Sequence, residues 1–188
     1  MSEFWKGSFG DSYTARNRVN WRARIPFWRR IMGLTGARSV FEMGCNAGWN
    51  LSAIREVAPN ARLLGCEINS KAYEQALFAG NDVVLEDGVI CLWTYAGVFD
   101  LVFTAGVLIH IDEDSIETTM RALVDASADY VLAVEYAADR SQAIEYRGHT
   151  DKLWSRPFGR MYEALGLTLM DSGEAEGFDR CQYWLLRK

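Results

Sequence analysis

The sequence predicts a doubly wound α/β fold, in which a mostly parallel, seven-stranded sheet ends in an antiparallel hairpin. Apolar runs alternate with amphipathic stretches from about residue 35 onward, as in chains whose strands are joined by helical crossovers. The early runs are continuous rather than alternating, which is typical of parallel strands covered on both faces. The last two runs, LTLMDSGEA and CQYWLLRK, are separated only by the turn EGFD, which is too short for a parallel crossover.

The expected strands and helices follow one another along the chain. We expect strands at RSVFEMG, ARLLGCEIN, DVVLED, FDLVFTAGVLIHI and YVLAVEY, followed by the two strands of the final hairpin. We expect helices at NLSAIREVAP, at SKAYEQALFAG after a cap at Asn69 or Ser70, at DEDSIETTMRALVDAS with a capping box of Asp114 and Glu117, and at FGRMYEALG. Residues 1–34 and 136–160 fit this alternation badly. We interpret them as an N-terminal arm and a second lid segment over a domain of residues 35–188.

The bulk composition indicates one globular domain that binds no duplex nucleic acid. The chain has 188 residues, 49% of them hydrophobic, and a formal net charge of −5. The basic stretch RNRVNWRARIPFWRR is interpreted as an amphipathic helix with a solvated arginine face, and an RNA-binding stripe is the alternative.

Other features predict a cytoplasmic protein without a metal site. The N-terminus MSEFWKGSFGDSY has no secretory pattern, and no apolar run reaches membrane-spanning length. The four cysteines, at positions 45, 66, 91 and 181, show no paired short spacing. Buried thiols are therefore expected instead of disulfides or zinc ligands.

The stretch SVFEMGCNAGWNLSAI points to a ligand loop between the first strand and its helix. Gly44 and Gly48 remove side chains where a ligand must come close, and Asn46 tolerates left-handed backbone geometry. A dinucleotide loop favours glycine at the middle position as well. The pattern here, with Glu42 leading, better suits a ligand that brings a carboxylate and an amine.

Acids at the ends of the next two strands extend this predicted site. Glu67 closes the second strand, where a carboxylate can accept two hydrogen bonds from a ribose diol. Glu86 and Asp87 end the third strand, where an adenine amino group would lie, although either could be a plain surface acid. The alternative is that the loop of residues 42–48 is an ordinary strand–helix turn and that the acid after it is simply solvated.

These residues carry a resemblance to a known family. VFEMGCNAGWNL, LLGCEIN, LEDG and FDLVFTAGVLIHI resemble, in order, the motifs of class I S-adenosylmethionine-dependent methyltransferases over about residues 35–188. FWKGSFGDSYTARN and EYRGHTDKLWSRPFG look like a narrower group, the methylases associated with pseudaminic acid biosynthesis. The departure is Asn46, where the family usually has glycine.

The resemblance implies the Rossmann-like methyltransferase fold and S-adenosylmethionine as cofactor. Glu42, Gly44, Asn46 and Gly48 would line the methionine part, and Glu67 would hold the ribose. Further implied contacts are Ile68 packing on the adenine, Asp87 and Gly88 at the adenine edge, and Ala105 and Gly106 beside the methionine.

Few residues could act on the acceptor of such a methyl transfer. His110 follows the fourth strand, His149 lies in the second lid segment near Asp151, and Glu135 and Tyr136 end the fifth strand. A base helps only if the acceptor group must lose a proton. For both histidines, a purely structural role is the alternative.

The N-terminal arm offers further contacts. Tyr13, Arg16 and Asn17 share a helical face, and Arg16 could grip a carboxylate or phosphate. Trp5 and Phe9 could close over the site. Together with Arg147 and Arg156, these residues favour a small anionic acceptor, such as a sugar acid or nucleotide sugar. The alternatives are a non-catalytic cofactor-binding or activator subunit and an NAD-dependent oxidoreductase.

Overall fold

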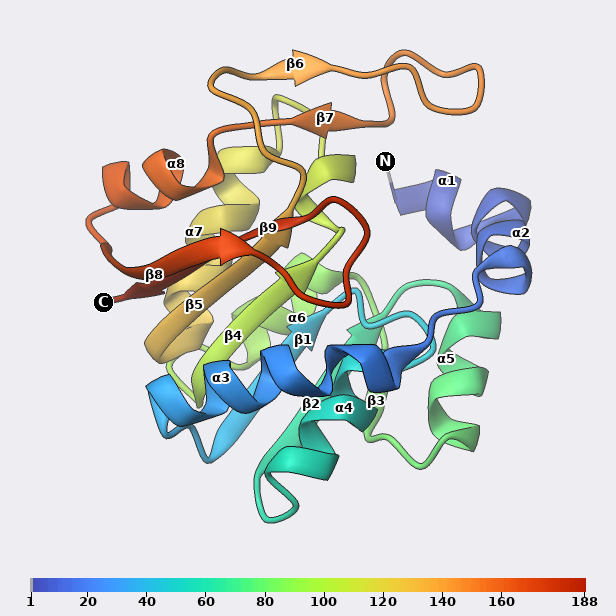
Figure 1. The fold of residues 1–188 in the computed structure, drawn as a ribbon. Helices are drawn as coiled ribbons and strands as arrows, with labels where there is room; N and C mark the ends of the chain where they lie inside the picture. The colour runs from blue at the N-terminus through green and yellow to red at the C-terminus, as the bar shows by residue number, and fades with distance from the viewer. Residues whose placement is uncertain (1) are drawn as a thin grey trace.

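The structure is a computed structural model that describes residues 2–188, so Met1, the first residue of the predicted arm, lies outside the described residues. Seven strands form one sheet in the order β3-β2-β1-β4-β5-β9-β8 (Figure 1). The strands are β1 (Ser39–Met43), β2 (Arg62–Glu67), β3 (Val83–Leu85), β4 (Phe99–Ala105), β5 (Ser127–Glu135), β8 (Thr168–Glu174) and β9 (Gln182–Arg187). The first five are parallel, and β9 runs antiparallel to both β5 and β8. This confirms the predicted sheet with its final hairpin.

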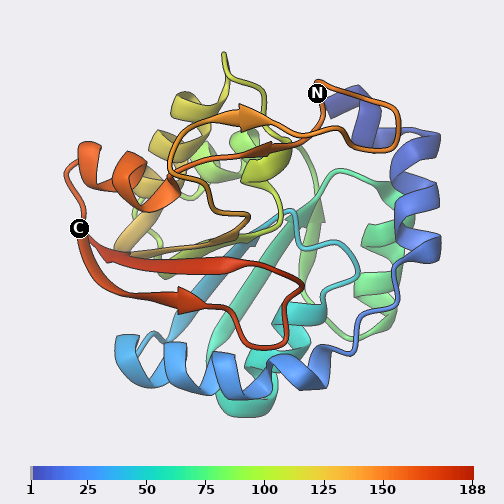
Figure 2. The ribbon, with the colours of Figure 1, turned by 45° about the horizontal axis from the view of Figure 1, so that its top comes forward.

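Helices cover both faces of this sheet (Figure 2). One face carries α3 (Ile25–Thr35), α4 (Trp49–Val57) and α5 (Ser70–Phe78), and the other carries α6 (Gly88–Thr94), α7 (Ile116–Ala126) and α8 (Phe158–Ala164). Neighbouring strand residues point to opposite faces, so Val40 packs in the core with α3 and Phe41 packs in the core with α7. Because both faces are covered, the inner strands β1, β4 and β5 are mostly apolar on both sides, as the sequence indicated.

Several local predictions differ from the structure. The helix α6 was not expected, and β5 begins at Ser127, which had been placed in the preceding helix. The capping box of Asp114 and Glu117 was wrong, because α7 starts after Ser115 and no side chain caps it. Instead, Asp112 Oδ1 accepts a hydrogen bond from the Ser115 N–H at 2.9 Å, which turns the chain before the helix begins.

The basic stretch before the sheet does not form one continuous helix. The short helices α1 (Ser2–Lys6) and α2 (Ser8–Arg16) are followed by a 3-10 turn, η1 (Trp21–Arg24), and then by α3. Phe27, Trp28 and Ile31 on α3 are buried against the sheet. The second half of the predicted arm is therefore a core helix, and the residues before α3 are the part of the arm that lines the cavity described below.

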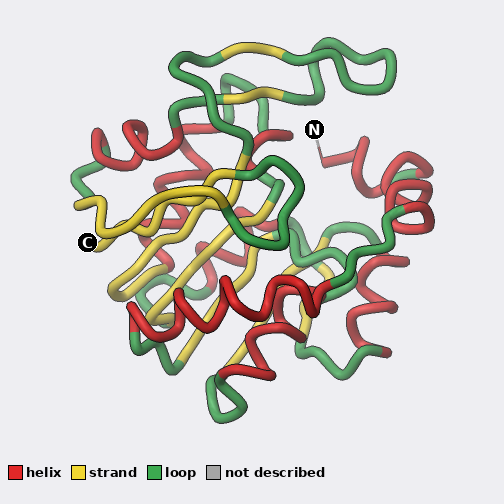
Figure 3. Tube along the Cα trace, viewed as in Figure 1, coloured by secondary structure: helices red, strands yellow, loops and turns green. Residues whose placement is uncertain are grey.

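Residues 137–156, called the strap here, follow β5 and lie outside the seven-stranded sheet, along one edge of the molecule (Figure 3). It contains the two-residue strands β6 (Gln142–Ala143) and β7 (Trp154–Ser155), which pair antiparallel with each other. Within residues 2–188, no helix combines the length and the apolar character needed to cross a membrane.

Candidate active site

A cavity of about 630 Å³ lies at the carboxyl ends of β1, β2, β4 and β5. Ligands bind at this end of open α/β sheets, where the strand order switches direction. The residues lining it fall into two halves. The strand-end half includes residues 42–46, 67–68 and 86–88, and the aromatic half includes Trp5, Tyr13, His110, Tyr136, Tyr146 and Phe178.

The loop after β1 has the tight geometry predicted for it. Gly44 has φ 71°, and a β-carbon there would come within 2.7 Å of Val107 Cγ2. Asn46 also has positive φ, 48°, so it takes the left-handed conformation in place of a glycine. The N–H groups of Gly44 and Cys45 both donate to the Cys66 carbonyl at 2.9 Å, which ties the loop to the end of β2.

Glu67 lies beside this loop and is only 7% exposed. Its Oε2 accepts the Asn46 N–H, and its Oε1 accepts the N–H groups of Ile68 and Asn69, all at 2.8 Å. Burial raises the pKa of Glu67, and these backbone donors oppose the rise. Because each carboxylate oxygen has two lone pairs and Oε1 already accepts twice, Glu67 keeps one acceptor position, on Oε2, for a ligand while it holds the loop in place.

Glu42 is almost fully buried beneath the loop. Its Oε1 accepts a hydrogen bond from Asn50 Nδ2 at 2.6 Å, while its Oε2 meets no partner in the described part of the chain. Burial is the main reason that the pKa of Glu42 rises to about 8. An unpartnered buried carboxylate oxygen is costly, so this atom is suited to receive a donor from a ligand.

The hydrogen bonds continue from Glu42 through Asn50 to Arg24. The sequence did not predict Asn50 or Arg24 as site residues. Arg24 Nη1 donates to Asn50 Oδ1 at 2.8 Å, and its guanidinium stacks on Phe178 with 4.0 Å to the ring centroid. Arg24 comes from η1 and Phe178 from the turn between β8 and β9. The one sequence signal for Asn50 is its place as a polar residue on the otherwise apolar, core-facing side of α4.

The remaining residues predicted around the cofactor divide into two groups. Ile68, Asp87, Gly88, Ala105, Gly106 and Tyr13 line the cavity, whereas Gly48 and Arg16 do not. Gly48, at φ 74°, starts α4, and a β-carbon there would lie 2.4 Å from Asn81 Nδ2. Arg16 is exposed and stacks over the Phe9 and Tyr13 rings, at 5.2 and 5.3 Å from their centroids.

His110 and Tyr136 line the cavity, whereas Glu135 and His149 do not. His110 Nδ1 lies 2.7 Å from the Lys152 carbonyl. Because a carbonyl only accepts, Nδ1 carries the proton and Nε2 is left as an acceptor. Burial lowers the pKa of His110 to about 4, so the ring is neutral at pH 7. His149 instead packs against Phe4, with ring centroids 5.3 Å apart.

Two buried charges hold the segment that carries His110. Glu135 is fully buried and accepts the N–H groups of Val107, Leu108 and Ile109 at 3.2, 3.1 and 3.4 Å. Burial raises the pKa of Glu135 to about 7. From the other end, Arg156 donates to the Leu108 and Ile111 carbonyls at 3.0 and 2.9 Å. Glu135 and Arg156 therefore position this wall of the cavity without lining it.

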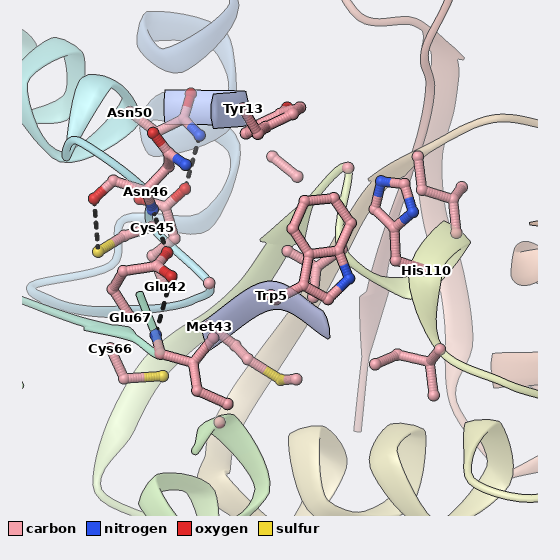
Figure 4. Close-up of a pocket in the computed structure, with 18 of the residues that line it drawn as sticks. Trp5, Tyr13, Glu42, Met43, Cys45, Asn46, Asn50, Cys66, Glu67 and His110 are labelled. Atoms are coloured by element: carbon pink, nitrogen blue, oxygen red, sulfur yellow. Dashed lines mark hydrogen bonds between the residues drawn. The ribbon is translucent and has the colours of Figure 1, made fainter. Parts of the chain in front are cut away.

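Trp5 reaches the cavity from the N-terminal arm and lies between Met43 and His110 (Figure 4). Its ring centroid is 4.5 Å from that of His110 and 5.4 Å from that of Tyr13. Asn69 holds the arm here, since its Nδ2 donates to the Trp5 carbonyl at 3.2 Å and to Asp11 Oδ1 at 2.9 Å. As predicted, Asn69 also caps α5, through its Oδ1 and the Ala72 N–H.

No protein-family model matches the sequence, and no curated protein does either. Solved structures do match. A 1,6-didemethyltoxoflavin N1-methyltransferase from Burkholderia thailandensis, with bound 1,6-didemethyltoxoflavin and S-adenosylhomocysteine, aligns with a TM-score of 0.75 at 14% identity over 100% of this chain and 86% of its own. The fold is that of class I methyltransferases.

Two further structures match with the same architecture. A SAM-dependent methyltransferase from Archaeoglobus fulgidus aligns with a TM-score of 0.72 at 14% identity, over 96% of this chain and 100% of its own. A sugar N-methyltransferase from a Streptoalloteichus species aligns with a TM-score of 0.69 at 15% identity, over 97% of this chain and 93% of its own. The methyltransferase fold thus spans the chain, arm and strap included.

Proposed function

We propose that this protein is an S-adenosylmethionine-dependent methyltransferase that acts on a small molecule. The observation that carries the proposal is the position of Glu67, which lines the cavity and at the same time receives the Asn46 N–H of the glycine-containing loop. If the ribose of the cofactor binds to Glu67, the adenine and the methionine would both lie against the strand-end half of the cavity. The similar structures with bound S-adenosylmethionine or its demethylated product support this choice of ligand.

Each residue of the strand-end half would contact a different part of the cofactor. The unpartnered Oε2 of Glu42 would accept from the methionine ammonium, and the loop of Gly44 and Asn46 would pass along the methionine chain. Ile68 would pack on the adenine, and Asp87 and Gly88 would meet its edge.

Two other groups of the predicted cofactor residues have different positions. Ala105, Gly106 and Tyr13 line the cavity and would lie where the methionine meets its aromatic half. Gly48 would act indirectly, by allowing α4 to start close to Asn81, and Arg16 would act only through its stacking on Tyr13.

Methyl transfer itself needs an acceptor atom held in line behind the sulfonium methyl. The acceptor's lone pair would form the new bond to the methyl carbon. The sulfur–carbon bond would break at the same time, and the electron pair of that bond would stay on sulfur. Among the four residues predicted to be catalytic, His110 has an unprotonated Nε2 and lines the cavity, so we assign it the role of taking the acceptor's proton. Tyr136 lines the same wall, whereas Glu135 and His149 would act through their neighbours.

The narrower expectations from the sequence have less support. An anionic acceptor would need free cations, but Arg16, Arg147 and Arg156 do not line the cavity. The likeness to the pseudaminic acid-associated methylases rests on the arm and strap sequences alone.

The test begins with the cofactor and ends with turnover. Mass spectrometry of the purified protein is expected to find S-adenosylmethionine or S-adenosylhomocysteine, and either compound is expected to raise the melting temperature while NAD does not. A screen with methyl-labelled cofactor against small metabolites and total RNA is then expected to label a small molecule. Stabilisation by NAD alone would favour the oxidoreductase, and cofactor binding without any turnover would favour an activator subunit.

A further inference from the structure

We infer that the methyl acceptor is a planar nitrogen heterocycle, neutral or cationic, that lies against the aromatic side chains that line the cavity. This inference rests on the proposed function, because it assigns the aromatic half of the cavity to the acceptor. It differs from the anionic acceptor suggested by the sequence. Three features of the aromatic half carry it: its flat side chains, its charge, and one unpaired donor beside one acceptor.

The aromatic half is walled by rings from distant parts of the chain. Trp5 and Tyr13 come from the arm, Tyr136 follows β5, Tyr146 belongs to the strap, and Phe178 lies in the hairpin turn. Trp5, His110 and Tyr146 form a continuous series, with ring centroids 4.5 and 5.5 Å apart. Such walls bind flat rings by stacking, and they also attract cationic groups through their electron-rich faces.

The charge of the cavity disfavours an anionic ligand. Two acids adjoin the aromatic half along the chain, Asp112 near His110 and Asp179 next to Phe178, and four more line the strand-end half, namely Glu42, Glu67, Glu86 and Asp87. Among the lining residues that the structure describes, Arg24 is the one lysine or arginine. Arg24 already donates to Asn50 and stacks on Phe178, so an anionic acceptor would compete for a cation that is in use. Like charges facing each other across a binding site cost affinity, so this set selects against acids.

Trp5 and His110 supply a donor and an acceptor on the same wall. The Trp5 Nε1–H is buried and finds no hydrogen-bond partner within residues 2–188. His110 Nε2 accepts, because the Lys152 carbonyl holds the proton on Nδ1. A heterocycle with an N–H and a C=O or ring nitrogen on one edge satisfies both, whereas a carboxylate has no donor for His110.

This acceptor class also closes the proton balance of the reaction. The ring nitrogen attacks the sulfonium methyl, the nitrogen–carbon bond forms, and the sulfur–carbon bond breaks to leave a neutral thioether. The methylated nitrogen is then positively charged and readily gives its proton to His110 Nε2, from which it passes to water. No reagent other than the cofactor is consumed.

The test titrates probes into the protein saturated with S-adenosylhomocysteine. Lumazine is flat and neutral, with N–H and C=O on its edges, 2-naphthoate is flat and anionic, and glucuronate is anionic without a flat ring. Binding is followed by calorimetry and by the indole N–H signals in nitrogen-15 NMR spectra. The Trp5 signal is identified as the one lost in Trp5→Phe, which keeps a ring but removes the donor. Trp93→Phe is the matched control, because Trp93 is 63% exposed and lies outside the cavity.

Lumazine is expected to bind at least about tenfold more tightly than either anion and to shift the Trp5 signal. Trp5→Phe should weaken lumazine binding about fivefold, the effect of one hydrogen bond, while Trp93→Phe leaves it unchanged. Tighter binding of either anion, no lumazine binding, or a Trp5 signal that does not move would overturn the inference. Failure of S-adenosylhomocysteine to bind in the first step would instead count against the proposed function.

Discussion

The two halves of the cavity are built in opposite ways. In the strand-end half, the functional groups are held by backbone neighbours: Glu67 receives the N–H groups of Ile68, Asn69 and the adjoining loop. In the aromatic half, the rings come from residues as far apart as Trp5 and Phe178, and ring contacts and charges buried elsewhere hold them. The first half is therefore a property of the sheet itself. The second half is a property of the arm and strap that were added to it, so each half can be altered separately.

The largest effect is expected from closing the strand-end half at Gly44. Gly44→Val places side-chain atoms against Val107 and forces a β-branched residue to φ 71°. Both consequences distort the loop that would carry the methionine. We expect the affinity for S-adenosylhomocysteine, measured by calorimetry, to fall at least about 100-fold, equivalent to about 2.7 kcal/mol.

Gly36→Ala is the control for the Gly44 variant. Gly36 also has positive φ, 60°, but open space surrounds its missing β-carbon, and it lies at the end of α3 outside the cavity. It should lose about 1 kcal/mol of stability and keep full affinity. Equal losses of affinity in both variants would mean that backbone strain alone matters, and that the loop does not hold the ligand.

The next effect belongs to the aromatic half. His110→Asn removes the proton acceptor, so kcat should fall about 100-fold once a substrate is known, as for loss of a general base. Affinity for S-adenosylhomocysteine should change by less than about twofold, because His110 is not assigned to the cofactor. His149→Asn changes a residue outside the cavity that would act only through its neighbours, so it should lower kcat far less than His110→Asn, by about threefold at most. A large loss of cofactor affinity in His110→Asn would show that the two halves are not separable.

A smaller effect is expected at Glu67. Glu67→Gln replaces one of the two accepting oxygens with an NH2 group, which only donates, so either the loop or the ribose contact loses its acceptor. We expect about a 30-fold loss of affinity for S-adenosylhomocysteine, in line with about 2 kcal/mol for a charged hydrogen bond. Glu74→Gln, on the exposed face of α5, is the matched control. The same loss in both variants would exclude a specific ribose contact.

The smallest effect concerns pH and Glu42. Because burial raises the pKa of Glu42 to about 8, the free protein holds a proton there at pH 7. A ligand ammonium favours the carboxylate, so binding should release that proton, and the affinity should rise about tenfold from pH 6 to pH 8 and then level off. Calorimetry in buffers of different ionisation enthalpy measures the release. If Glu42→Gln retains the same pH dependence, another group is responsible.

The sequence predicted the strand-end half because its signals are local. Gly44, Asn46 and Glu67 each follow a strand, and parallel strands bring their carboxyl ends to one edge of the sheet, so proximity followed from the fold. Asn46 was singled out because asparagine tolerates left-handed backbone geometry, and its φ is indeed positive. The helix α6 was missed because GVICLWT is short and lacks a polar face that would reveal a helical period.

The aromatic half could not be derived in the same way. Neither the distance of His110 from Trp5 nor its bond to the Lys152 carbonyl follows from spacing along the chain. Arg156 looked like a handle for an anion, but it is buried and holds carbonyls of the segment after β4. An arginine in a sequence shows its charge without showing what neutralises it, and only the tertiary contacts decide that.

The most direct test of the central claim is a crystal structure of the protein with S-adenosylhomocysteine bound. The account predicts a ribose hydroxyl within hydrogen-bond distance of Glu67 Oε2, with the amino-acid tail along the loop of Gly44 and Asn46 and its ammonium at Glu42. A bound ligand that leaves Glu67 untouched, or one that occupies the aromatic half instead, would contradict it.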